Sequence, residues 1–206
     1  MRALKWITYA KEPLHPGALQ HALAITRDSR DVNEHDLIDI GRLISFCAGL
    51  VIFDQESGVV RLVHYTTQNY LETYLPPADG NAEIATTCLR YLAFDAFVTS
   101  FIKKIPLATQ VEKYQLSSYA SRHWFEHVRG DSEDQFHVAI FETFESQGTR
   151  DSILQIAKYA TLTWHPFEDP ANISFLHLAS MHGLSKLCRV LLSRMSRNRR
   201  LWVSHS

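Results

Sequence analysis

The residues with the clearest spacing for chemistry are His123, Glu126 and His127, in the run His123-Trp124-Phe125-Glu126-His127. In a helix this H-x-x-E-H order places both imidazoles on one face, as the zinc site of an inverted zincin requires. This gives the hypothesis of a zinc-dependent hydrolase. We disfavour a metal at His123 and His127 because Trp124 and Phe125 supply the apolar stripe of that helix and no motif identifies a third acidic ligand. A five-residue pattern in a histidine-rich chain also matches readily by accident.

Other patterns of enzyme chemistry are missing from the sequence. It has no nucleophile elbow, no paired-carboxylate signature and no dinucleotide-binding glycine fingerprint. None of its eight glycines is followed by lysine, so the P-loop that would cradle nucleotide phosphates is absent. We therefore expect a non-enzyme with no catalytic residue and no cofactor, which by itself neither binds nor hydrolyses ATP.

The composition is that of a folded intracellular protein. The 206 residues are 46% hydrophobic, which is ample for a buried core, and the 21 basic and 22 acidic side chains give no global attraction to nucleic acid or anionic lipid. Three cysteines without short paired spacing fit free thiols in a reducing compartment. The longest apolar stretch, Ile44–Phe53, is too short to cross a bilayer. We expect a cytoplasmic location and no membrane contact.

The elements that must position these side chains begin with a winged-helix order over residues 1–75. Apolar spacing predicts a helix that Pro13 ends, a second helix from Pro16, and a third from Asn33 to Cys47. The β-branched runs Leu50–Phe53 and Val59–Val63 then predict a hairpin. A helix follows over residues 65–74, and Pro76 and Pro77 terminate it.

Residues 76–170 are predicted to form a helical bundle behind a linker, Pro76–Asn81. Beyond the linker every long segment has helical spacing. Gly130 and Gly148 stand where helix C-caps would fall, and Pro166 and Pro170 mark a final loop. The fold class predicted for the whole chain is mainly α, with the hairpin as its one β element.

Residues 171–206 match the first unit of an ankyrin stack. The pattern of turn, L-H-x-A, glycine and a second helix is carried by Leu176, His177, Ala179, Gly183, Leu191 and Leu192. His177 is expected to hydrogen-bond neighbouring backbone. One ankyrin unit cannot bury its own faces, so it must pack on the bundle or continue in a longer parent chain. We expect this chain to be a fragment or a truncated gene product.

Several segments in order resemble fungal NACHT-ankyrin proteins. They are Ala3–Leu23, Leu43–Val51, Arg61–Leu71, Tyr91–Asp95 and Tyr119–Trp124. In that family the first region is the winged-helix domain named after its GPI inositol-deacylase relatives, and it follows the nucleotide-binding domain. The resemblance covers nearly the whole chain and reaches the start of the ankyrin motif.

The family belongs to the STAND class of signal-transducing NTPases, in which nucleotide exchange releases an autoinhibited fold. The resemblance implies a NACHT nucleotide-binding domain as partner in the parent protein, and other proteins as partners of the ankyrin surface and the bundle. It also implies that His64 touches the phosphate of bound ADP when that domain is present. The alternative for His64 is a strand-end histidine hydrogen-bonded across the hairpin.

Two further readings concern nucleic acid. A winged helix can place its third helix in the major groove, but here that helix has Glu34, Asp36 and Asp39 against Arg42, so the phosphate backbone would repel it. The segment after Leu184 also contains six basic residues and no acidic residue. We interpret this basic end as an exposed helix face docked on the acidic body, with RNA binding as the alternative.

The sequence thus favours a non-catalytic regulatory or scaffold module of a NACHT-type signalling protein. In this reading it couples a nucleotide-binding switch domain to an ankyrin protein-binding array. A winged-helix nucleic-acid-binding protein is the first alternative, and the zinc-dependent hydrolase is the second.

Overall fold

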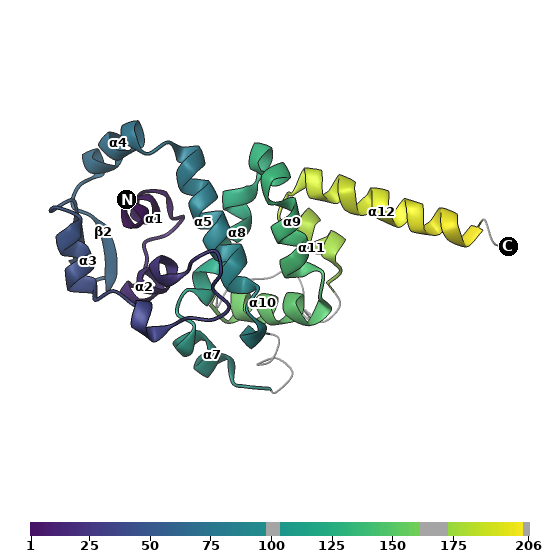
Figure 1. The fold of residues 1–206 in the computed structure, drawn as a ribbon, viewed down its shortest axis with the longest axis horizontal. Helices are drawn as coiled ribbons and strands as arrows, with labels where there is room; N and C mark the ends of the chain where they lie inside the picture. The colour runs from purple at the N-terminus through teal and green to yellow at the C-terminus, as the bar shows by residue number, and fades with distance from the viewer. Residues whose placement is uncertain (98–103, 161–172, 204–206) are drawn as a thin grey trace.

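The computed structural model describes residues 1–97, 104–160 and 173–203, with side chains in the last range as far as residue 196. The N-terminal part has the predicted winged-helix order of helices, a hairpin and a further helix, with four helical segments before the hairpin where three were predicted (Figure 1). The elements are α1 (Arg2–Tyr9), α2 (Pro16–Ala24), the 3-10 helix η1 (Glu34–Asp36), α3 (Ile40–Phe46), β1 (Val51–Asp54), β2 (Val59–Leu62) and α4 (Tyr65–Tyr74).

The hairpin forms where the sequence predicts it. Strands β1 and β2 are antiparallel, with Asp54 opposite Val59 beside the turn. The Asp54 carboxylate accepts the backbone N–H groups of Glu56 at 3.1 Å and Ser57 at 3.4 Å. Gly58 has a φ of +69°, which residues with a side chain rarely adopt. The polar run between the strands therefore makes a tight turn that fixes their register.

The prediction of one helix from Asn33 to Cys47 is wrong. Asn33 does act as an N-cap, but the helix it caps is only the three-residue η1. The backbone is extended at Leu37, and Asp39 then caps a separate helix, α3, by accepting the backbone N–H of Arg42 at 3.0 Å. Two capping side chains six positions apart divide a stretch that apolar spacing alone assigns to one helix.

The linker predicted for Pro76–Asn81 is also wrong, because these residues begin α5 (Pro77–Leu92). Pro76 is the N-cap and Pro77 the first helical residue, where a missing N–H costs nothing. Helix α5 packs against both α1 and α8. The contact with α1 is close, since a Cβ on Gly80 would lie 2.1 Å from a ring carbon of Tyr9.

The predicted helical bundle follows. Its elements are α5, α7 (Leu107–Lys113), α8 (Ser117–Val128), the 3-10 helix η2 (Gly130–Ser132), α9 (Glu133–Phe144) and α10 (Gln147–Ala160). Gly130 has a φ of +86° just after α8, as expected at a helix C-terminus. Gly148 is not a cap, because it lies inside α10. The short helix α7 was not predicted.

One hydrophobic cluster runs through the winged-helix domain and the bundle. Trp6 of α1 packs edge-on against Tyr119 of α8, with ring centroids 5.6 Å apart. Deeper in the bundle Trp124 stacks on Phe144 at 4.5 Å. Of the three cysteines, Cys47 and Cys88 are buried and Cys188 is half-buried, and all are free thiols. The N-terminal helices and the bundle thus share a continuous core.

The C-terminal segment forms a helix–turn–helix pair, α11 (Phe175–Met181) and α12 (Ser185–Val203). Gly183 lies between the helices with a φ of +67°. Helix α12 has 19 residues against the 7 of α11, and Figure 1 shows it projecting from the body. The predicted loop with Pro166 and Pro170 falls outside the described residues. Within the described ranges, no helix combines the length and apolarity that a bilayer span requires.

Candidate functional site

His127 of the H-x-x-E-H run is a buried hydrogen-bonding residue. Its Nε2 lies 2.8 Å from the Tyr119 hydroxyl and its Nδ1 lies 2.8 Å from Oδ1 of Asn81, so one residue from α8 and one from α5 hold the ring. Burial, helped by the charge of Lys11, lowers the pKa of His127 to about 3. The ring is therefore neutral at physiological pH, with both nitrogens engaged by protein groups.

His123 belongs to a charge-paired cluster that joins α8 to the segment after α1. Its Nδ1 lies 2.7 Å from Glu126, and its Nε2 lies 3.5 Å from Glu12. Arg122 pairs with both carboxylate oxygens of the same Glu12. The contacts with His123 and Arg122 hold the pKa of Glu12 at about 2 against the opposing effect of burial. Burial lowers the pKa of His123, but the two carboxylates outweigh it and the net shift is upward.

This arrangement does not favour the zinc hypothesis. Both imidazoles do lie on one side of α8, since their rings flank that of Tyr119 with centroids 4.9 and 6.2 Å away. The nitrogens of His123 face carboxylates and those of His127 face a hydroxyl and an amide, so they do not converge on one point. In the part of the chain that the structure describes, no group of three or more His, Cys, Asp or Glu side chains could hold a metal ion.

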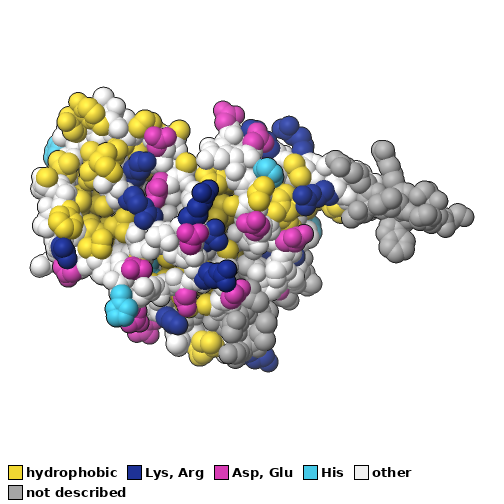
Figure 2. Space-filling view, viewed as in Figure 1, with side chains coloured by type: hydrophobic (Ala, Val, Ile, Leu, Met, Phe, Trp, Pro, Cys, Tyr) yellow, Lys and Arg dark blue, Asp and Glu magenta, His cyan; other side chains and the backbone are white. Residues whose placement is uncertain are grey.

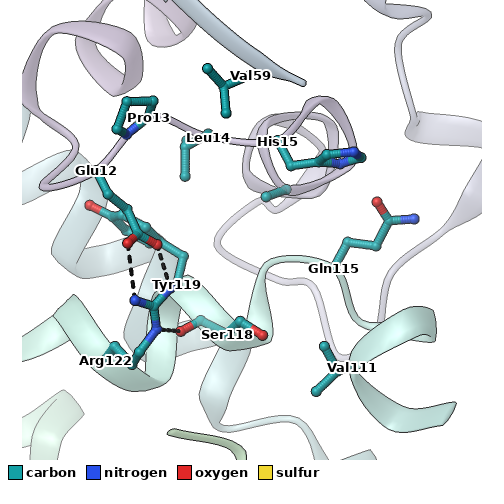
Figure 3. Close-up of a pocket in the computed structure, with 11 residues that line it drawn as sticks. Glu12, Pro13, Leu14, His15, Val59, Val111, Gln115, Ser118, Tyr119 and Arg122 are labelled. Atoms are coloured by element: carbon teal, nitrogen blue, oxygen red, sulfur yellow. Dashed lines mark hydrogen bonds and ion pairs between the residues drawn. The ribbon is translucent and has the colours of Figure 1, made fainter. Parts of the chain in front are cut away.

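A cavity of about 350 Å³ lies beside this cluster, between the winged-helix domain and the bundle. Figure 3 shows the Glu12–Arg122 pair on one side of it, with His15 and Gln115 on the other. A Cβ on Gly17 would fall 1.4 Å from the Gln115 side-chain oxygen, so α2 and the α7–α8 connection approach closely here. Because Glu12 already neutralises Arg122, the cavity is better suited to bind an apolar ligand than an anion.

His64 is the N-cap of α4, which corrects the expectation of a bond across the hairpin. Its Nδ1 accepts the backbone N–H of Thr66 at 3.3 Å and lies 2.8 Å from the Thr66 hydroxyl. The ring lines a second cavity, of about 300 Å³, together with Lys11 and Arg61. Thr8 lines the same cavity, and its buried hydroxyl has no hydrogen-bond partner among the described residues. A helix N-terminus, two cations and an unpaired hydroxyl are groups that suit a phosphate.

The winged-helix domain exposes several large apolar side chains on α3, the hairpin and α4. We call these the winged-helix surface: Phe46, Phe53, Val63, Tyr65, Tyr70 and Tyr74. Phe46 is 69% exposed, Tyr70 57% and Tyr74 64%. Figure 2 shows hydrophobic side chains gathered over this end of the molecule. Large exposed patches of this kind mark interaction sites.

The residues of the ankyrin pattern lie on α11, α12 and the turn between them. Ala179 is fully buried, Leu176 and Leu191 are half-buried, and His177 and Leu192 are exposed. The ring of His177 lies 3.1 Å from the side-chain hydroxyl of Ser174, the N-cap of α11, whereas a backbone partner was expected. The pair rests on the bundle through Phe175, whose ring lies 5.1 Å from that of Phe141 on α9.

The basic end contacts the acidic body where the structure describes its side chains. Lys186 Nζ lies 2.7 Å from Asp134, and the backbone N–H of the same residue donates to Glu133 at 2.8 Å. Arg194 lies over the ring of Phe141, 4.1 Å from its centroid. The interpretation of this segment as docked on the same molecule agrees with these contacts at the start of α12.

Three features were not anticipated from the sequence: the Tyr119–His127–Asn81 network, the Glu12–Arg122 pair and the winged-helix surface. The first two join residues tens of positions apart, for which a single sequence holds no signal. The winged-helix surface did have a sequence signal. Helix α4 contains Tyr65, Tyr70 and Tyr74 within ten residues, more aromatic side chains than one buried face of a helix can accommodate.

Comparison with known proteins supports the winged-helix assignment. Residues 1–87 match the family model described as "GPI inositol-deacylase, winged helix domain". A curated relative from Monascus ruber, "Azaphilone pigments biosynthesis cluster protein L", is 24% identical to this chain. The match covers 66% of the chain and 32% of the relative, so the chain spans about a third of that protein's length. No solved structure matches the chain.

Proposed function

We propose that this chain is a non-catalytic regulatory module of an intracellular NACHT-type signalling protein. Its role is to couple a nucleotide-binding switch domain to an ankyrin protein-binding array. The winged-helix surface is the observation that carries the proposal. It exposes large apolar side chains, although other apolar side chains of the same domain are buried in the core. A switch domain packed on this surface would bury them.

The polar groups of the chain support a structural and regulatory role more than a catalytic one. The histidines that could do chemistry, His123 and His127, are engaged with Glu12, Glu126, Tyr119 and Asn81. These contacts tie α8 to α5 and to the segment after α1. A displacement of the winged-helix domain by its partner would therefore be carried directly into the bundle.

His64 is the proposed point of contact with the nucleotide of the switch domain. Its Nδ1 is engaged in capping α4, which leaves Nε2 as the atom to meet a phosphate oxygen. Lys11 and Arg61 line the same cavity and would add positive charge. Arg61 is shared with Asp54, whose carboxylate lies 3.0 Å from its Nε, so Lys11 would supply the larger part.

The ankyrin array is the proposed continuation at the other end. Helices α11 and α12 have the order of an ankyrin unit, with a left-handed glycine between them and apolar side chains packed on α9. A further unit stacked on this pair would extend the binding surface away from the bundle.

Sequencing the full transcript that contains this reading frame tests the architecture. We expect a P-loop domain encoded before residue 1 and further L-H-x-A units after residue 206. A transcript that encodes neither would contradict the proposal. So would stoichiometric zinc in the purified chain that disappears in the variant His123→Ala/His127→Ala.

The role of His64 is tested in the full-length protein defined by that transcript. His64→Ala should weaken ADP binding about tenfold, the effect of losing one hydrogen bond to a charged phosphate. His35→Ala, which changes another exposed histidine of the same domain, is the matched control and should leave ADP affinity unchanged. Equal affinities for all three proteins would remove His64 from the nucleotide site.

A further inference from the structure

Helix α12 extends well beyond the helix with which it pairs. At a rise of 1.5 Å per residue its 19 residues span about 28 Å, whereas the 7 residues of α11 span about 10 Å. Figure 1 shows α12 leaving the body at the end opposite α3 and α4. Most of α12 therefore has no α11 alongside it.

The same helix is basic and exposes apolar side chains. From Ser185 to Val203 the sequence contains one lysine, five arginines and no acidic residue. Lys186 is paired with Asp134 of the same molecule, so the arginines supply the charge that a partner would meet. Leu192 is 53% exposed and Met195 is 50% exposed. A helix that combines a high positive charge with exposed apolar side chains is suited to bind an acidic surface that is itself apolar.

The winged-helix surface has the complementary character. Residues 27–74, which contain it, carry eight acidic and four basic side chains. Four of the acids, Asp31, Glu34, Asp36 and Asp39, are exposed in the segment that leads into α3. That segment also exposes Ile38, and α3 ends at the 69% exposed Phe46. Acidic and apolar side chains therefore occur together at this end of the molecule.

The two surfaces cannot meet within one molecule, because they lie at opposite ends of its long axis (Figure 1). We infer that α12 of one copy docks on the winged-helix surface of a second copy. The contact joins two different surfaces, so it repeats head to tail and produces rings or open chains instead of a closed two-fold dimer. This interaction does not depend on a nucleotide-binding domain, but it uses the surface on which the proposed switch domain would pack, so the two interactions exclude one another.

Size and charge set the expected strength. A single amphipathic helix on an open surface buries less than a standard protein interface, so we expect a dissociation constant on the order of 10 µM. Opposite net charges steer the association, and salt screens them. Raising the ionic strength from about 0.05 M to about 0.5 M should therefore weaken it about tenfold.

Two variants of the 206-residue chain test the inference by sedimentation velocity over a range of concentrations. A surface variant carries Phe46→Ser, Tyr70→Ser and Tyr74→Ser, and a tail variant carries Leu192→Glu and Met195→Glu. All five side chains are exposed, so both variants should keep the helical circular dichroism of the natural chain. Each variant alone should sediment as a monomer.

Mixing the two variants distinguishes head-to-tail docking from other contacts. The intact tail of the surface variant should bind the intact surface of the tail variant, giving a 1:1 complex and nothing larger. A control with Val138→Ser and Tyr159→Ser, which removes exposed apolar side chains of α9 and α10, should associate as the natural chain does.

Three outcomes would overturn the inference: a natural chain that stays monomeric at 100 µM in low salt, self-association that survives either variant, or a mixture that forms no complex. Vesicles containing phosphatidylserine provide a separate check. If α12 binds them and the chain does not self-associate, the basic helix recognises a membrane surface and the docking site proposed here is wrong.

Discussion

The helices of the winged-helix surface and those of the bundle differ in how much they bury. All residues of α3 and α4 are described, and each helix has one buried residue, Leu43 and Leu71 respectively. Helix α5 buries eight residues and α8 buries seven. Since burial of apolar area is the main source of stability, the bundle holds the chain folded. The winged-helix surface is left free to bind, and the predictions below test this division.

The largest effect is expected for Trp124→Ala in the bundle. Trp124 is 1% exposed and stacks on Phe144, so the substitution removes a large buried ring and leaves a cavity. The free energy of unfolding should fall by about 3–5 kcal/mol. Urea denaturation followed by circular dichroism measures the change. A loss below 1 kcal/mol would mean that the bundle is not the stable part of the chain.

The pH dependence of stability should also come from the bundle. Burial lowers the pKa of His127 to about 3 and that of His182 to about 4, from an ordinary value of 6.5. These two histidines therefore bind protons in the unfolded chain at pH values where they stay neutral in the folded chain. The free energy of unfolding falls as the pH drops below 6.5. Between pH 7 and pH 5 each histidine should cost about 2 kcal/mol, with His123, whose pKa is raised, opposing them.

Thermal denaturation at several pH values measures this dependence. His182→Phe retains the stacking on Phe125, where the ring centroids are 3.8 Å apart, but removes one titrating group. In this variant the stability should therefore depend less steeply on pH between pH 7 and pH 5, by the contribution of His182. An unchanged slope would show that His182 is protonated equally in the folded and unfolded chains.

A smaller effect is expected at the junction of the two regions. Arg122→Met keeps the length of the side chain but removes the bidentate contact with Glu12, a partly exposed pair. The free energy of unfolding should fall by about 1 kcal/mol. Arg61→Met, which breaks the more exposed pair with Asp54 in the hairpin, is the matched control and should cost less. Equal losses would mean that the junction adds nothing beyond an ordinary surface ion pair.

The smallest effect is expected on the winged-helix surface itself. Tyr70→Ser combined with Tyr74→Ser removes two exposed rings of α4. The free energy of unfolding should change by no more than about 0.5 kcal/mol for the double variant, because neither ring packs in the core. Urea denaturation of the monomeric chain measures it. A loss as large as that of Trp124→Ala would show that these tyrosines hold the domain together.

Local signals in the sequence were enough to predict the order of elements. The hairpin has β-branched runs around a polar turn, and α2 begins at a proline suited to that position. The same reasoning failed where two local signals competed. Asn33 and Asp39 both cap, so the third helix is divided. The helix over residues 65–74 does end before Pro76, as predicted, but the same two prolines also begin α5 where a linker was expected.

The contacts of the candidate site depended on information that a single sequence does not contain. Glu12 and Arg122 are 110 positions apart, and Asn81 and His127 are 46 apart. Nothing local distinguishes these residues from ordinary surface polar groups. The spacing of His123 and His127 correctly placed both rings on one side of α8, but it carried no information about the partners that engage them.

Helix α5 has a consequence for how any signal would cross this molecule. It is separated from the end of α4 by two residues, lies so close to α1 that a Cβ at position 80 would displace the Tyr9 ring, and continues along α8 in the bundle. A movement of the winged-helix domain would therefore displace α5 as a rigid helix. Because the same helix packs along α8, the displacement would reach the bundle without an intervening loop that could absorb it.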